Sequence, residues 1–141
     1  MTRVFIDSNV WLRYFLKDND QFESCQKLIQ AVEYGQCKPY ISSIVLLEVI
    51  YVIKSVYKLE RIKISEIIGA ITDMRNLTII DKTNSWLAIK MMEKFNVKFA
   101  DCLIATQVPK RAILATFDQE LSKIAGRNCQ TPAKILALLR D

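Results

Sequence analysis

Short runs of apolar and β-branched residues alternate along this chain with longer segments in which apolar side chains recur at helical spacing. The short runs predict strands at 2–6, 39–41, 77–80, 112–115 and 127–130. The longer segments predict helices at 9–16, 21–34, 43–57, 63–75, 83–95, 100–108, 118–125 and from 132 onward. This alternation is typical of an α/β fold in which a mainly parallel sheet lies between layers of helices.

Residues at the predicted helix ends support these boundaries. Gly126 stands where the seventh helix would end, and glycine readily adopts the left-handed conformation found at that place. Ser42 or Ser43 would cap the N-terminus of the third helix. The Thr131-Pro132 pair would open the last helix, because proline is favoured at the first helical position.

Length and composition indicate one compact domain spanning residues 1–141. The chain has 141 residues, of which 51% are hydrophobic, so it can bury a substantial core. Its apolar runs are shorter than the roughly 18 residues that suggest a membrane span. Asp7 and Arg13 interrupt any signal-like apolar stretch at the start. We therefore expect a cytoplasmic protein with no membrane partner.

Histidine is absent, and the four cysteines are widely scattered without a C-x-x-C pair. Structural zinc is thereby disfavoured, and reduced, packed thiols are expected instead. Without histidine the usual general base and the Ser-His-Asp and Cys-His nucleophile systems are also missing. Any hydrolysis would have to be performed by carboxylates, lysines or a metal ion.

Four carboxylates lie in apolar or aromatic surroundings where a charge is normally unfavourable. They are Asp7 after Val4-Phe5-Ile6, Glu48 within Ile44–Ile53, Asp101 after Phe99-Ala100, and Asp118 after Leu114–Phe117. Carboxylates are rarely buried unless they are paired or bound to metal. None of the four has an obligatory basic neighbour, so the sequence predicts a shared counter-ion.

The predicted fold would bring these four acids together. Asp7 and Asp118 follow strands, and sites in parallel α/β folds form at the carboxyl ends of strands. Glu48 and Asp101 lie early in helices that could aim at the same place. Four like charges repel unless they are protonated or bridged by cations. Because the donors are all oxygen, Mg²⁺ or Mn²⁺ is the favoured ion.

An ordinary structural role competes with this interpretation. Asp7 and Asp118 precede predicted helices, where a negative charge is favourable in any case. Glu48 is harder to explain in that way, because its helix is apolar nearly all round and is therefore expected to be buried. Ser8, Asn9 and Thr116 could orient the carboxylates, and Ser8 and Asn9 could equally cap the helix after Asp7.

A net charge of +5 suits a polyanionic substrate held near an acidic, metal-binding pocket. Candidate nucleic-acid contacts are two groups of basic residues at helical spacing, each of which could instead be a solvated helix face. These groups are Arg13 with Lys17, and Lys54 with Lys58 and Arg61. Four aromatic residues could cover a dimer or peptide-binding surface, or could pack in the core: Trp11, Tyr14, Phe15 and Tyr57.

The ordered motifs resemble the PIN-domain family, specifically the VapC-type ribonuclease toxins of prokaryotic toxin–antitoxin pairs. The resemblance spans essentially the whole chain and includes the closing Thr131-Pro132 helix. The motifs that carry it are Phe5-Ile6-Asp7-Ser8-Asn9-Val10, Ser42-Ser43-Ile44-Val45-Leu46-Leu47-Glu48-Val49, Phe99-Ala100-Asp101-Cys102-Leu103-Ile104-Ala105 and Leu114-Ala115-Thr116-Phe117-Asp118-Gln119-Glu120-Leu121.

The resemblance implies a PIN-like α/β/α sandwich and a Mg²⁺- or Mn²⁺-dependent endoribonuclease. The catalytic, metal-binding acids would be Asp7, Glu48, Asp101 and Asp118, supported by other polar residues. It also implies a homodimer and a small antitoxin protein whose C-terminal segment occludes the site. The chain departs from the family at Lys98, where many members carry another acid; a lysine there would alter a second metal site or contact RNA.

Two other functions remain open on the sequence alone. A phosphotransfer protein of haloacid-dehalogenase or receiver type also places an aspartate after its first strand. The former would need an acid at Asn9, and the latter needs an acidic pair and a lysine that are missing here. A non-catalytic binding module with the same fold is the third hypothesis, although it would have no need of four mutually repelling carboxylates.

Overall fold

A parallel five-stranded sheet forms the centre of the computed structural model, which describes residues 1–17, 20–125 and 128–140. The strand order is β3-β2-β1-β4-β5, and all neighbouring pairs are parallel. Within the described residues the strands are β1 (Thr2–Ile6), β2 (Cys37–Ser42), β3 (Thr78–Ile80), β4 (Ala112–Ala115) and β5 (Cys129–Gln130). The predicted fold class, an α/β/α sandwich, is confirmed.

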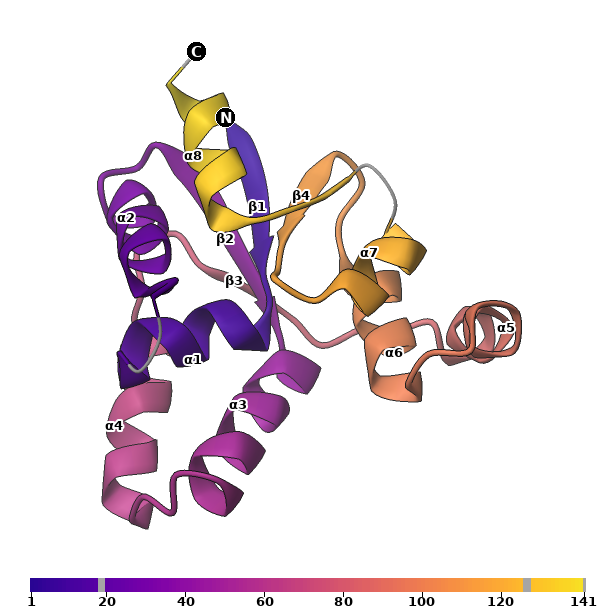
Figure 1. Ribbon diagram of the computed structural model, residues 1–141, viewed down its shortest axis with the longest axis horizontal. Helices are drawn as coiled ribbons and strands as arrows, with labels where there is room; N and C mark the ends of the chain where they lie inside the picture. The colour runs from indigo at the N-terminus through magenta and orange to yellow at the C-terminus, as the bar shows by residue number, and fades with distance from the viewer. Residues whose placement is uncertain (18–19, 126–127, 141) are drawn as a thin grey trace.

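Helices connect the strands and cover the sheet (Figure 1). In the described parts of the chain they are α1 (Ser8–Leu16), α2 (Phe22–Glu33), α3 (Ser43–Ser55), α4 (Arg61–Thr72), α5 (Ser85–Phe95), α6 (Phe99–Gln107), α7 (Gln119–Ala125) and α8 (Pro132–Leu139). Helices α2 and α8 pack together on one side, and α5, α6 and α7 form a group on the other. Helices α3 and α4 run in roughly opposite directions, and in this view they project beyond the end of the sheet.

Strand β2 is longer than predicted because its proline is tolerated. Pro39 pairs with Val4 of β1, whereas β3 joins β2 only from Tyr40 onward. At Pro39 the strand therefore has a neighbour on one side only, and a residue without an N–H is accepted at such a place. The Gly126 helix end and the start of the 127–130 strand lie outside the described residues.

Helix α3 ends earlier than predicted, and this changes one candidate RNA contact. It stops at Ser55, and Lys58 adopts a left-handed conformation with φ of 53° before α4 begins at Arg61. The interpretation of Lys54, Lys58 and Arg61 as one helical face is wrong, because a turn separates them. All three side chains are nevertheless exposed.

The core lies between the sheet and its helices, and it contains Trp11, one of the four aromatic residues considered for a partner surface. Trp11 is fully buried, and its indole N–H donates to the Ile6 carbonyl oxygen at 3.1 Å. Tyr14 and Phe15 are half-buried against the same core. Of the four candidate aromatic residues only Tyr57 is exposed, so the surface hypothesis is wrong for Trp11.

The sheet register brings distant segments to one edge. Strands β1 and β4 are neighbours, with Ile6 opposite Ala115, and the Asp7 N–H continues the ladder by donating to the Ala115 carbonyl oxygen. Asp7 and Thr116 consequently emerge side by side from the carboxyl ends of their strands. None of the described helices is both long enough and apolar enough to span a bilayer.

The start of α3 depends on one buried serine, and we expect its loss to be measurable. Ser42 is fully buried, and its hydroxyl accepts a hydrogen bond from the Val45 N–H. Replacing Ser42 with alanine should lower the free energy of unfolding by about 1–2 kcal/mol, because an N-terminal N–H loses its partner. Urea denaturation measures this change. The control is Ser65→Ala at an exposed position of α4, which removes no cap and should not lower the free energy of unfolding; equal losses from both changes would contradict the capping role.

Candidate functional site

Asp7 is the buried centre of a polar cluster at the carboxyl edge of the sheet. Its side chain is only 4% exposed although it is an acid. One oxygen, Oδ1, accepts the Ser8 N–H at 2.8 Å, so that Asp7 is the N-cap of α1. The other, Oδ2, accepts the Thr116 hydroxyl at 2.7 Å and lies 3.4 Å from Asn9 Nδ2. Asp7 therefore caps α1 with one carboxylate oxygen and joins the polar cluster with the other.

The Thr116 hydroxyl uses its full hydrogen-bonding capacity to join both ends of this cluster. It donates to Asp7, and it accepts from Asn9 Nδ2 and from the Asp118 N–H, each at 3.0 Å. A hydroxyl has one proton and two lone pairs, so no capacity is left over. Asn9 completes the arrangement because its Oδ1 accepts the Phe117 N–H. Asn9 and Thr116 hold the Asp7 carboxylate in place, whereas Ser8 contributes its backbone.

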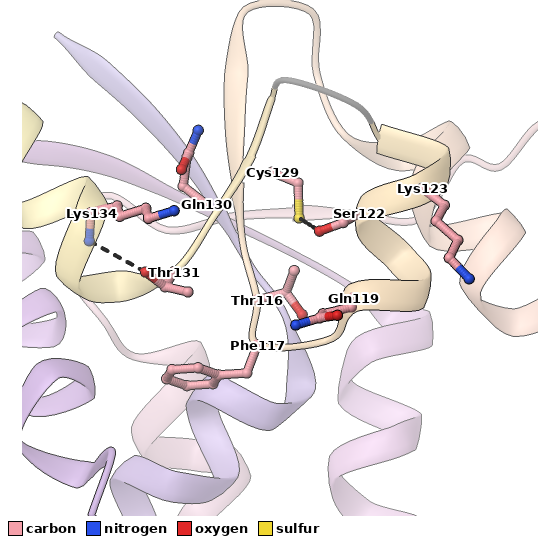
Figure 2. Close-up of a pocket in the computed structure, with 9 residues that line it drawn as sticks. All are labelled: Thr116, Phe117, Gln119, Ser122, Lys123, Cys129, Gln130, Thr131 and Lys134. Carbon is pink, nitrogen blue, oxygen red and sulfur yellow. Dashed lines mark hydrogen bonds between the residues drawn. The ribbon is translucent and has the colours of Figure 1, made fainter.

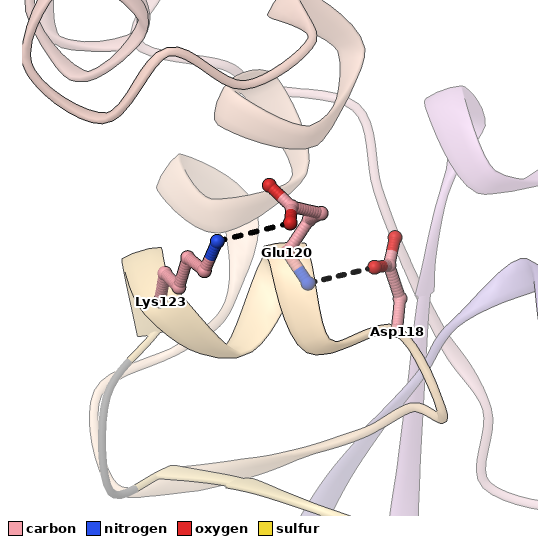
Figure 3. Close-up of polar contacts among 3 residues, drawn as sticks. All are labelled: Asp118, Glu120 and Lys123. Atoms are coloured by element: carbon pink, nitrogen blue, oxygen red, sulfur yellow. Dashed lines mark hydrogen bonds and ion pairs between the residues drawn. The ribbon is translucent and has the colours of Figure 1, made fainter.

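Asp118 is tied in part to its own helix. Its Oδ1 accepts the Glu120 N–H at 2.9 Å, and Glu120 in turn pairs with Lys123 (Figure 3). The helix-terminal interpretation is thus correct for one Asp118 oxygen. The side chain is half-buried, and its other oxygen is not used in this contact.

Glu48 lies on α3 and Asp101 lies in the first turn of α6, so helices rather than strand ends position these two acids. Asp101 is buried, and Glu48 is half-buried. One oxygen of each, Glu48 Oε1 and Asp101 Oδ2, is shielded from solvent without a hydrogen-bond partner among the described residues. A buried carboxylate oxygen without a donor is costly, and such an atom suggests that something else normally contacts it.

The charges of the four acids act on one another. Burial raises the pKa of Asp7 to about 6, against the opposing effect of the Thr116 and Ser8 hydrogen bonds, and the charges of Asp101 and Asp118 raise it further. Burial and the negative charge of Asp7 raise the pKa of Glu48 to about 7. The pKa of Asp101 is also raised, by burial first, although Lys98 acts against the change.

A hard divalent cation fits this set of groups. All the donors are oxygens, two of them are buried without a partner, and the carboxylates repel one another. As they stand, no three acids or cysteines among the described residues are gathered tightly enough to hold an ion. The four carboxylates thus act on one another electrostatically without forming a ligand shell in this arrangement.

The candidate cations differ in how they relate to the acids. Arg13 donates from a guanidinium nitrogen to the Asn9 carbonyl oxygen at 3.1 Å and stacks over the Phe117 ring at 4.6 Å. Lys98 is close enough to Asp101 and Glu48 to stabilise their charged forms. Lys17 instead lies over the Phe22 ring, away from these contacts.

Two features of the site could not be read from the sequence. Phe117 joins Arg13 to Asn9 through its ring and its N–H, and only its place beside Thr116 hinted at such a role. Helix α3 was expected to be buried on all sides, but Leu47 is 64% and Tyr51 70% exposed. These two side chains, with Val52, Glu48 and Lys98, line an open hollow of about 480 Å³.

Comparison with known proteins places this geometry in a family. The family model of the PIN domain matches residues 4–127. The chain belongs to the PIN domain family. This match includes the segments that carry all four acids.

Two solved structures have the same fold at low sequence identity. PAE2754 from Pyrobaculum aerophilum is 12% identical, with a TM-score of 0.69, over 99% of this chain and 96% of that one. VapBC2 from Rickettsia felis, solved bound to a DNA fragment from its promoter, gives a chain that is 19% identical, with a TM-score of 0.65, over 92% of this chain and 98% of that one. No curated protein matches this PIN-domain chain.

The Thr116 hydroxyl should be required for stability through its hydrogen bonds. Thr116→Val removes one hydrogen-bond partner from Asp7 and one from Asn9 and leaves the Asp118 N–H without its acceptor, so we expect the free energy of unfolding to fall by about 1–3 kcal/mol. Chemical denaturation measures the loss. Thr116→Ser is the matched control, because it keeps the hydroxyl and should lose less stability than valine; a serine variant as destabilised as the valine variant would contradict the role of the hydroxyl.

The raised pKa values predict that the metal-free PIN domain becomes less stable as the pH rises. Unfolded carboxyls ionise near pH 4, whereas folded Asp7 and Glu48 keep their protons to about 6 and about 7. Between these values the folded state binds more protons than the unfolded state, so the free energy of unfolding falls from about pH 4 to about pH 7. Denaturation in the presence of a chelator at a series of pH values measures the slope.

Glu48→Gln isolates one part of this pH dependence. It removes a titrating group, so the profile should become flatter, most clearly between pH 5 and 7. Glu66→Gln on exposed α4 is the control and should leave the slope unchanged. Parallel profiles for the wild type and Glu48→Gln would contradict the raised pKa of Glu48.

Proposed function

We propose that the protein is a Mg²⁺- or Mn²⁺-dependent endoribonuclease and that residues 1–141 work as a single PIN-like nuclease domain. The observation that supports the proposal is that the negative charges of Asp7, Asp101 and Asp118 all act on half-buried Glu48, and that one shielded oxygen each of Glu48 and Asp101 lacks a hydrogen-bond partner among the described residues. Repelling carboxylates are unfavourable for folding, and their retention in one place is best explained by a cation that binds there.

The acids would divide the work according to their surroundings. Asp7 and Asp101 are the most buried and would hold the ion, with Glu48 and the free oxygen of Asp118 completing its ligands. A bound divalent ion supplies a Lewis acid that polarises the phosphodiester and lowers the pKa of a water molecule. Asn9 and Thr116 keep the Asp7 carboxylate oriented, as partners of metal ligands commonly do.

Cations near the acids would hold the RNA backbone. Arg13, already fixed against Phe117 and Asn9, and exposed Lys98 are the best placed of the candidates. Lys54, Lys58 and Arg61 could contribute from the projecting end of α3 and the start of α4, while Lys17 would play a smaller part. A single-stranded segment or loop is the favoured substrate, because its bases are accessible.

We further propose that the protein is a cytoplasmic toxin component, which forms a homodimer and is inhibited by a cognate antitoxin protein. The likeness to a chain of the VapBC2 complex supports this idea at the level of fold. The hollow beside Glu48 also supports it, because apolar Leu47 and Tyr51 flank an acid there. A segment with an arginine or lysine among apolar residues could bind in such a place and neutralise the carboxylates.

A non-catalytic RNA- or protein-binding module is the second candidate function. The open arrangement of the carboxylates, which do not form a ligand shell as they stand, favours this alternative. Phosphotransfer of the dehalogenase type is disfavoured, because the position that would need an acid is Asn9 and its amide is engaged with Thr116 and Phe117.

Removing either of the two most buried acids should abolish RNA cleavage. Asp7→Asn and Asp101→Asn keep the shape of each side chain and remove its charge, so the metal-dependent cleavage rate should fall on the order of 100-fold or more. Cleavage of a labelled RNA with Mg²⁺, with Mn²⁺ and with a chelator provides the measurement. Asp81→Asn, at an exposed position, is the charge-matched control and should retain full activity. Undiminished cleavage by Asp7→Asn would refute the assignment.

A further inference from the structure

A cavity of about 430 Å³ lies directly beside the carboxylate cluster, on the side of β5, α7 and the start of α8 (Figure 2). Thr116 and Phe117 form its wall toward the cluster. Because the Thr116 hydroxyl is 2.7 Å from Asp7 Oδ2, the cavity and the acids are separated by a single side chain. A polymer bound across the acids could therefore extend into it.

The cavity offers a cation that is not engaged elsewhere in the described chain. Lys134 lines it, and Figure 2 shows its side chain running toward Gln130. No carboxylate of the described residues lies within ion-pairing distance of Lys134. Lys123 lines the same cavity but is paired with Glu120 at 3.0 Å, and its amine points away in Figure 2. The available positive charge is thus that of Lys134.

The other lining groups suit a nucleotide rather than a simple anion. Phe117 supplies an aromatic ring, and Gln119 supplies an amide with both a donor and an acceptor. Grooves that bind single strands combine cations for the phosphates with aromatic rings for the bases. The volume lies within the range of sites for small molecules, so it has room for a nucleotide but not for a duplex.

We propose that this cavity is the subsite for a nucleotide of single-stranded RNA next to the scissile bond, with Lys134 on its phosphate and Phe117 against its base. The inference rests on the proposed ribonuclease function and adds to it the direction in which the strand leaves the acids. The beginning of α8 is not the basis of the proposal, because the Lys134 N–H there is already capped by the Thr131 hydroxyl.

Binding of a fluorescent single-stranded RNA of about ten nucleotides, measured by anisotropy at several salt concentrations, tests the proposal. Lys134→Ala should weaken binding about threefold to tenfold and lower the slope of log affinity against log salt by about 0.7, as expected for one lost phosphate contact. Phe117→Leu should weaken binding about fivefold or more, because the aromatic ring that stacks on the base is lost.

The matched control is Lys63→Ala, which removes the same charge from exposed α4 and should leave both quantities unchanged. Thermal unfolding checks that each variant folds. Unaltered affinity and slope in Lys134→Ala, an equal effect of Lys63→Ala, or no RNA binding by the wild type would each overturn the subsite. RNA cleavage is measured separately. If the wild type cleaves RNA but Lys134→Ala binds RNA with unchanged affinity and slope, the subsite alone is refuted. If Lys134→Ala shows the predicted change in slope but the wild type does not cleave RNA, the nuclease function alone is refuted.

Discussion

The parallel pairing of β1 with β4 is the constraint on which the rest of the site depends. With Ile6 opposite Ala115, the chain leaves both strands at the same edge, and Asp7 meets Thr116 within hydrogen-bonding distance. A shift of one residue in this register would turn the two side chains to opposite faces of the sheet. More than 100 residues separate these positions in sequence, so the contact that defines the cluster exists only when β1 and β4 have paired.

The charged forms of the acids are unfavourable in the folded chain, although a metal ion would need them. Burial and mutual repulsion raise the pKa values of Asp7, Glu48 and Asp101, which means that the charged forms are unfavourable in the folded chain. The hydrogen bonds of Thr116 and Ser8 offset part of this cost at Asp7, and Lys98 offsets part of it at Asp101. A cation would offset the remainder, so ion binding and stability should be coupled.

The sequence predicted the order of elements well, because that order depends on local signals such as apolar runs and capping residues. Charges in apolar surroundings also pointed to the burial of Asp7 and Asp101, whereas the role of the four acids as metal ligands stays a prediction. The sequence could not predict the end of α3, where a left-handed Lys58 reverses the chain, nor the exposure of Leu47 and Tyr51. An apolar residue looks the same in sequence whether it faces the core or an open hollow. The lining of the cavity beside Phe117 was also hidden, because it combines α7, β5 and α8.

The central claim is that these carboxylates converge to hold a divalent cation, and diffraction from crystals grown with millimolar Mn²⁺ tests it most directly. We predict an anomalous difference peak between the side chains of Asp7 and Asp101, within ligand distance of both and with Glu48 and Asp118 around it. A crystal that shows the four side chains without a peak, or with Mn²⁺ bound only elsewhere on the molecule, would contradict the account.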